Sequence, residues 1–408
     1  MQGKFPDNTC KNKCKNKWGL CVVLCIKFCY NYNNIASSEY LLGYKEKVEA
    51  FQMKNKVVMA AGLLLLAGSL FAYDPPAGGQ NHLRLSSPMA LTGANSTAGG
   101  SVYDVIPSSV LTNPALPAFE QRVVLDLGGT LLTDKNKNED DGTLGGAFQL
   151  GISIPTRWCV PTFIAQGLFA PLVDMPLGNH MAFTANLSKD INDKVSVGLG
   201  ATFGGFWYKD ISDWTFAANT GVYYNYGDLL FMKNLRFGVT LMNLGKMYSK
   251  AEMPSIKGNL ADDWPGLATP RAGVAANFVD TGDFRIGLSS DFAAPAFQNF
   301  VLDLGVALEY SGLSFATFKL ASAWEYDVLE FSEGCKNIIP SVGLSVKFNF
   351  SAKSDTLAKR GWNESEITVA GAWRNLYKDI NAFSAGAVLK LGMEDKDPPV
   401  ITLWEGEN

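Results

Sequence analysis

Large apolar residues occupy every second position of the segment 300–310, whose sequence is FVLDLGVALEY. Phe300, Leu302 and Tyr310 belong to the apolar set, whereas Asp303 and Glu309 belong to an intervening set of mostly small or charged residues. Successive side chains of a strand point to opposite faces, so this segment predicts a strand with one apolar face. Such a strand fits a soluble sandwich, or a membrane barrel whose apolar face touches lipid and whose other face lines the lumen.

The same alternation recurs down the chain and predicts about 14 strands. We expect them over residues 122–133, 144–154, 160–171, 179–190, 193–207, 214–226, 233–244, 270–280, 282–293, 299–311, 312–325, 337–350, 366–378 and 380–393. An even number of strands is what a closed barrel with both chain ends on one side requires. In residues 313–324 the alternation changes phase near Phe318, which leaves either a bulge or a misplaced turn open.

Connection lengths favour a barrel over a sandwich. If the first strand starts in the periplasm, short turns fall at Asn192–Asp193, Asp280–Gly282 and Ser311–Gly312. Longer, external connections fall at 134–142, 245–269 and 325–336, while the long stretch 351–365 and the tight hairpin at Lys378–Asp379 depart from this scheme. Aromatic residues such as Trp207, Trp214 and Tyr326 gather at strand ends, as in interfacial girdles, although ordinary core aromatics are the alternative. The predicted fold class is an all-β, transmembrane antiparallel β-barrel.

The segment before the strands predicts export. Residues 53–72, MKNKVVMAAGLLLLAGSLFA, combine two early lysines, an apolar core too short to span a bilayer and a small-residue end, so they predict a signal peptide cleaved after Ala72. Residues 1–52 resemble nothing that follows and are interpreted as a mis-called start. A metal cluster of its five cysteines is the alternative, but the segment holds no histidine and no paired CxxC.

Two segments flank the predicted barrel. Residues 73–121 are rich in Pro, Gly, Ser and Ala, yet contain apolar residues to bury, which predicts a short helical or looped element packed inside another structure. Residues 394–408 leave the last strand through Pro398–Pro399 and are expected to form a periplasmic tail.

Composition excludes several function classes. The net charge of −4 argues against a nucleic-acid binder. The chain has two histidines, His82 and His180, so neither His-based catalysis nor a His metal site is expected. The glycines of GLGATFGG at 198–205 alternate with other residues inside a predicted strand, so a phosphate loop is not expected. The acidic run at 139–141 lacks EF-hand spacing and predicts a solvated loop, and Cys159 and Cys335 leave a disulfide open. We expect no catalytic residues, no metal and no cofactor.

Several features together resemble the FadL-type outer-membrane transporters of long-chain fatty acids and other hydrophobic compounds. They are the exported chain, the Pro-rich segment with Asn113, Pro114 and Ala115, and the strand pattern. Within that group, LRFGVTLMNLGK at 235–246 and PRAGVAANF at 270–278 look like the PorV-type branch. The final residue is not aromatic, which departs from the ending that barrel-assembly machinery reads in many such proteins.

The resemblance implies a function and a site. Residues 73–121 would form a hatch that plugs the lumen, with Asn113, Pro114 and Ala115 at its tight turn. Transport would be passive: hydrophobic molecules such as long-chain fatty acids would enter from the external loops and leave sideways into the outer-membrane lipid. The expected apolar contacts in the 245–269 loop are Met247, Met253, Trp264 and Leu267. A barrel that works by protein contact, as PorV-type proteins do, and a surface adhesin or antigen are the alternatives.

Overall fold

The computed structural model describes residues 85–92, 96–136, 142–173, 176–208, 210–246, 268–297, 300–328, 339–351, 364–376 and 379–392. Several predictions lie outside these residues: the mis-called start at 1–52, the signal peptide at 53–72, the acidic run at 139–141, the contacts in the 245–269 loop, Cys335 and the tail at 394–408.

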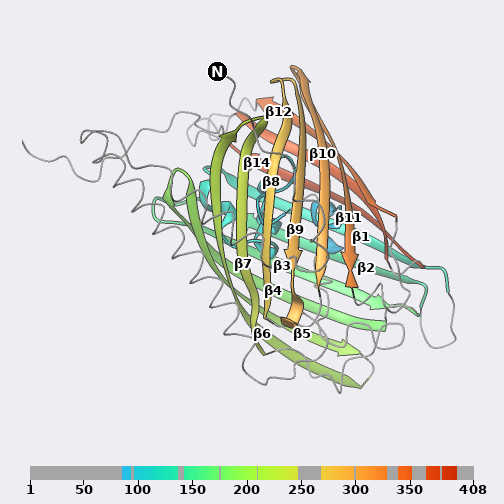
Figure 1. Cartoon of the computed structure of the whole chain (residues 1–408). Coiled ribbons are helices and arrows are strands. Elements are labelled where there is room, and N and C mark those ends of the chain that lie inside the picture. The colour runs from blue at the N-terminus through green and yellow to red at the C-terminus, as the bar shows by residue number, and fades with distance from the viewer. Residues whose placement is uncertain are drawn as a thin grey trace, which may run out of the picture. The chain divides into compact units, whose positions relative to one another are not determined.

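Antiparallel strands form a closed barrel in which sequence neighbours pair and the first strand pairs with the last (Figure 1). The strands are β1 (Val123–Asp134), β2 (Leu144–Ser153), β3 (Val160–Pro171), β4 (Pro176–Asn192), β5 (Val195–Tyr208), β6 (Ile211–Leu229), β7 (Met232–Lys246), β8 (Thr269–Asp280), β9 (Phe284–Ala293), β10 (Val301–Leu313), β11 (Ala316–Asp327), β12 (Ser341–Ser351), β13 (Glu364–Leu376) and β14 (Ile380–Leu391). The predicted fold class is confirmed, and each predicted strand is present with ends shifted by a few residues. We call the end of the barrel where β1 begins and β14 ends the terminal end, and the other the opposite end.

The faces of the strands follow the predicted alternation. Along β10, Asp303 and Glu309 point inward and are less than a tenth exposed, whereas Leu304 and Val306 point outward and are each 40% exposed. Apolar side chains cover the outside of the other strands in the same way. A contiguous apolar surface of this kind needs an apolar environment, and lipid supplies it. The described residues include no helix long and apolar enough to cross a membrane.

The turn between β10 and β11 differs from the prediction. It lies at Ser314–Phe315, so the turn predicted at Ser311–Gly312 is wrong. The phase change near Phe318 follows from the later turn, because Phe315 lies in that turn and the alternation of β11 starts only after it. The pairing of β10 with β11 also shifts between Tyr310 and Leu313. An extra residue on one strand moves every following side chain to the other face. The shift therefore made β10 look shorter than it is.

The other two short turns are confirmed to within a residue or two. Asp193–Lys194 joins β4 to β5, where the Asn192 side-chain oxygen accepts hydrogen bonds from the amides of Lys194 and Val195, both at 2.9 Å. Residues 281–283 join β8 to β9. The expectation of long connections at the opposite end holds only in part, since 172–175 and 209–210 are also short.

Three short helices, joined by turns and extended segments, lie inside the barrel (blue to cyan in Figure 1). They are α3 (Pro88–Leu91), η4 (Pro107–Leu111) and η5 (Leu116–Phe119), and each has a proline in its first turn, where the missing N–H costs nothing. Helix α3 packs on β1 and β12 to β14, η4 on β1 to β3, and η5 on β3 to β5. The described residues 85–92 and 96–121 are called the hatch below. A further short helix, η6 (Pro295–Phe297), precedes β10.

Candidate functional site

Inward-facing glycines of the wall seat the backbone of the hatch. A Cβ atom built on Gly198 of β5 would overlap the carbonyl oxygen of Pro114. A Cβ atom built on Gly238 of β7 would likewise overlap the carbonyl oxygen of Thr97. Hatch and wall are therefore in contact at backbone distance, and no larger residue fits at these positions.

Asn113 forms the corner between η4 and η5 and is fully buried. Its amide nitrogen donates to the carbonyl oxygens of Thr97 at 2.7 Å and Val222 at 3.1 Å, and its side-chain oxygen accepts from the amide of Ala115 at 2.9 Å. One side chain thus ties two parts of the hatch to each other and to β6.

The carbonyl groups that follow Asn113 are held by the wall. The Pro114 oxygen accepts hydrogen bonds from the Asn186 amide at 2.9 Å and the Ser188 hydroxyl at 3.0 Å, both from β4. The Ala115 oxygen accepts from the Ser196 hydroxyl of β5 at 2.9 Å. The structure thus brings the predicted triplet together with polar lumen residues that the sequence did not single out. Its role in transport stays a prediction.

Apolar side chains gather inside the barrel at the opposite end, on the side formed by β1 to β5, β13 and β14. This apolar cap consists of Leu85, Leu91, Leu132, Ala147, Leu168, Ala170, Leu172, Ala182, Phe206, Leu376, Ile380 and Ala382. Leu85 and Leu91 come from the hatch, and the others from the wall or, for Leu172, from the residue that follows β3. Burial of this apolar surface stabilises the folded protein by about 25 cal/mol for each Å² removed from water.

Charged side chains line the lumen at the terminal end. A cavity of about 320 Å³, called the terminal cavity here, lies between the hatch and the wall. Its lining includes the hatch carboxylates Asp104 and Glu120 and the wall cations Lys319 and Lys390. The two ends of the lumen therefore differ in chemistry, with apolar contacts at one and ion pairs at the other.

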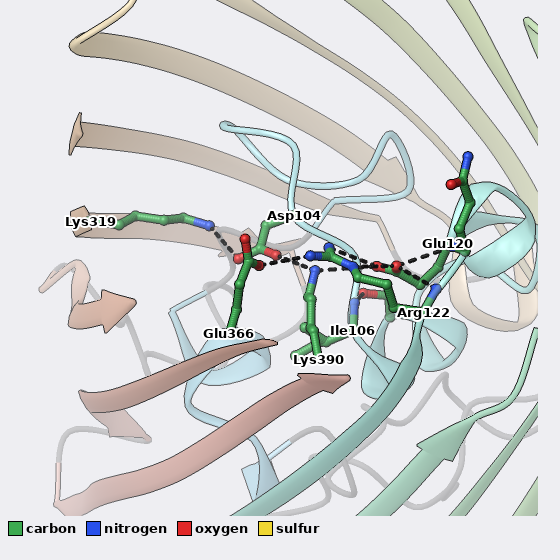
Figure 2. Close-up of polar contacts among 9 residues, drawn as sticks. Asp104, Ile106, Glu120, Arg122, Lys319, Glu366 and Lys390 are labelled. Carbon is green, nitrogen blue, oxygen red and sulfur yellow. Dashed lines mark hydrogen bonds and ion pairs between the residues drawn. The ribbon is translucent and has the colours of Figure 1, made fainter. Parts of the chain in front are cut away.

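Ion pairs join the hatch to three positions outside it, Arg122, Lys319 and Lys390 (Figure 2). Asp104 contacts Lys319 of β11 at 3.3 Å and Lys390 of β14 at 3.4 Å. Glu120 contacts Arg122 at 2.9 Å and Lys390 at 3.4 Å. Arg122 also contacts Glu366 of β13 at 2.9 Å, so the charges form one network.

This network shifts the acid–base behaviour of the two hatch carboxyls. Burial raises the pKa of Asp104, but the positive charges of Lys319, Lys390 and Lys347 outweigh it and hold the pKa well below its usual range. Burial also raises the pKa of Glu120, and Lys390 and Arg122 outweigh it in the same way. Both carboxylates are therefore ionised and paired at neutral pH.

Two further charged residues of the wall, on β7 and β9, also hold the backbone of the hatch. Arg236 of β7 is fully buried, and its guanidinium donates to the carbonyl oxygens of Gly100 at 3.0 Å and Ser101 at 3.1 Å. Asp291 of β9 accepts from the amide of Thr97 at 2.8 Å and pairs with Arg271 at 2.8 Å. These residues were not singled out in the sequence analysis, although a charged residue at an inward-facing strand position is the signal that could have found them.

Other candidate chemistry finds no support in the described part of the chain. The segment 198–205 lies within β5, so its glycines are strand residues and not a phosphate loop. His180 of β4 is buried beside Phe206, with ring centroids 4.8 Å apart. Cys159 is free, and the described residues contain no group of three or more His, Cys, Asp or Glu placed to hold a metal.

Three solved structures are similar to this chain. A FadL homologue of Pseudomonas aeruginosa is 12% identical, and the match covers 77% of this chain and 98% of that one with a TM-score of 0.45. The toluene transporter TodX of Pseudomonas putida is 10% identical, with 78% and 99% covered and a TM-score of 0.46. The toluene transporter TbuX of Ralstonia pickettii is 11% identical, with 76% and 100% covered and a TM-score of 0.46.

The resemblance to the FadL type and its PorV-type branch stays a prediction. No protein-family model matches the chain. No curated protein matches it either.

Proposed function

We propose that this protein carries hydrophobic molecules passively across the bacterial outer membrane. The observation that carries the proposal is the apolar cap, which lines part of the opposite end of a lumen that also holds the hatch. A water-filled porin for polar solutes would have neither. The apolar outer surface of the barrel supports a place in a lipid bilayer.

The order of chemistries along the lumen fits an apolar cargo. A molecule that enters at the opposite end first meets apolar side chains, among them Leu132 and Phe206, which favour its transfer from water. The ion pairs of the terminal cavity disfavour the same molecule, because they would lose solvent without gaining a polar partner. Transport therefore requires the hatch to move. No step needs a catalytic residue, so we propose a transporter and not an enzyme.

The cargo class is tested by uptake. The full chain, inserted into lipid vesicles, is expected to take up a labelled long-chain fatty acid saturably and to leave a labelled sugar outside. Toluene is the second probe, because it is the named cargo of TodX and TbuX. Uptake of toluene alone would indicate that the cargo is a small hydrocarbon and not a fatty acid.

A matched pair of variants on β1 tests the route. Leu132 points into the cap and is buried, whereas its neighbour Leu131 points outward and is 52% exposed. Leu132→Gln is expected to lower uptake about tenfold, and Leu131→Gln to leave it near the wild-type value, with heat-modifiable gel mobility as the check on folding. Equal uptake by both variants would contradict a route through the apolar cap, and stable capture of an exported protein without any uptake would favour the partner-binding alternative.

A further inference from the structure

Five donor side chains form a compact patch on β11, β12 and β13 inside the terminal cavity. In the strand register, Lys347 pairs with Thr317 on one side and Thr368 on the other, and Ser345 pairs with Lys319. Paired residues of neighbouring strands lie about 5 Å apart, and residues two apart on one strand share a face. We call these five residues the donor patch: Thr317, Lys319, Ser345, Lys347 and Thr368.

The charges of the cavity do not cancel. Its lining holds five cations and four carboxylates, namely Arg122, Arg285, Lys319, Lys347 and Lys390 against Asp104, Glu120, Glu309 and Glu366. Each carboxylate has an ion-pair partner among these cations. Lys347 has none within the described ranges, and it is only half-buried. One positive charge of the cavity is therefore left over.

The hydroxyl groups beside Lys347 also lack hydrogen-bond partners among the described residues. Among the residues that the structure describes, the side chains of Thr317, Ser345 and Thr368 make no hydrogen bond to protein, although Ser345 is buried. An ammonium group flanked by hydroxyl donors is the arrangement that binds the oxygens of a phosphate or carboxylate group. A metal cation would instead meet three lysines in the same cavity.

We propose that the donor patch binds an oxyanion, a phosphate or carboxylate group, with Lys347 as the central ligand. Lys319 contributes from the next register position while it stays paired with Asp104. The cavity, at about 320 Å³, accommodates a free phosphate or the phosphate group of a lipid. The proposal does not depend on hydrophobic transport, because the site lies on the other side of the hatch from the apolar cap.

Calorimetry on the full chain in a zwitterionic detergent at low salt tests the site, with inorganic phosphate and short-chain phosphatidate as separate probes. We expect one phosphate to bind per chain. Lys347→Met is expected to weaken it at least tenfold, and Lys347→Arg to retain it. Lys233→Met is the matched control, since it removes a lysine from the start of β7, outside the cavity lining.

A second variant separates a built site from a general positive field. Thr317→Val with Thr368→Val keeps every charge and removes two donors, so it is expected to weaken phosphate about tenfold. Binding of phosphatidate alone, lost in Lys347→Met, would assign the oxyanion to a lipid. Absence of binding by both probes, or equal binding in the wild type and Lys347→Met, would overturn the proposal, with gel mobility confirming that each variant folds.

Discussion

Asn113 fastens the hatch through three hydrogen bonds from one buried side chain. Asn113→Ala leaves the buried carbonyls of Thr97 and Val222 and the amide of Ala115 without this partner, which costs about 1–3 kcal/mol for each group left unsatisfied. We expect the barrel to form normally and the hatch to loosen, seen as frequent openings in single-channel recordings. Asn225→Ala, on the same strand as Val222, is the control, since the side-chain oxygen of Asn225 accepts a hydrogen bond from the Gly227 amide of its own strand at 3.0 Å; openings equally frequent in both variants would contradict the assignment.

Glycine at 198 is required by the approach of the hatch backbone. Gly198→Ala would place a methyl group on the Pro114 carbonyl, where backbone must shift to admit it. Gly205, on the same strand, has no atom within 4 Å of a built Cβ, which makes Gly205→Ala a matched control. Protease cleavage within residues 96–121 is expected to accelerate several-fold in Gly198→Ala only. Equal cleavage rates would show that the hatch is not seated there.

The hatch, as an element, is held at the terminal end by carboxylates whose pKa values are lowered. A released hatch takes up protons at about pH 4, the ordinary range for Asp and Glu. The seated hatch takes them up only at lower pH, so the ion pairs stabilise it fully above about pH 5, and this stabilisation is lost as pH falls through the lowered pKa values. We expect conductance to stay low from pH 7 to 5 and to rise below about pH 4.

Replacing one carboxylate should reproduce part of the acid effect at neutral pH. Asp104→Asn removes the partner of Lys319 and Lys390, so openings are expected to increase at pH 7 and to depend less on pH. Glu325→Gln breaks an ion pair with Arg374 that joins two wall strands and not the hatch, which makes it the control. An unchanged pH profile in Asp104→Asn would show that this carboxylate does not help to hold the hatch in place.

On the scale of the whole molecule, the barrel is closed within the chain and apolar outside. Val306 points outward near the middle of β10, where an arginine in the bilayer costs about 2–4 kcal/mol. Phe315 lies in the turn at the terminal end, where the same change costs about 0–1 kcal/mol. Reversible unfolding in lipid vesicles is expected to rank Val306→Arg as clearly less stable than Phe315→Arg. Equal stabilities would argue against lipid around the middle of β10.

The sequence by itself determined the strands and their faces. Side chains alternate with a period of two, so the apolar set of β10, from Leu302 to Tyr310, had to share one face wherever the strand lay. The same local rule placed Asp303 and Glu309 on the inner face. It failed at Ser311–Gly312, because the shifted pairing between Tyr310 and Leu313 depends on the neighbouring strand and not on local spacing.

The tertiary structure alone decided what meets inside the lumen. Asp104 lies 215 residues from Lys319 and 286 from Lys390, and these three side chains meet only because β14 closes on β1 and the hatch lies inside. No spacing in the sequence encodes such a contact, since the distance along the chain says nothing about where a barrel closes. The same holds for the seat at Gly198 and for the uncommitted donors around Lys347, whose neighbours come from three separate strands.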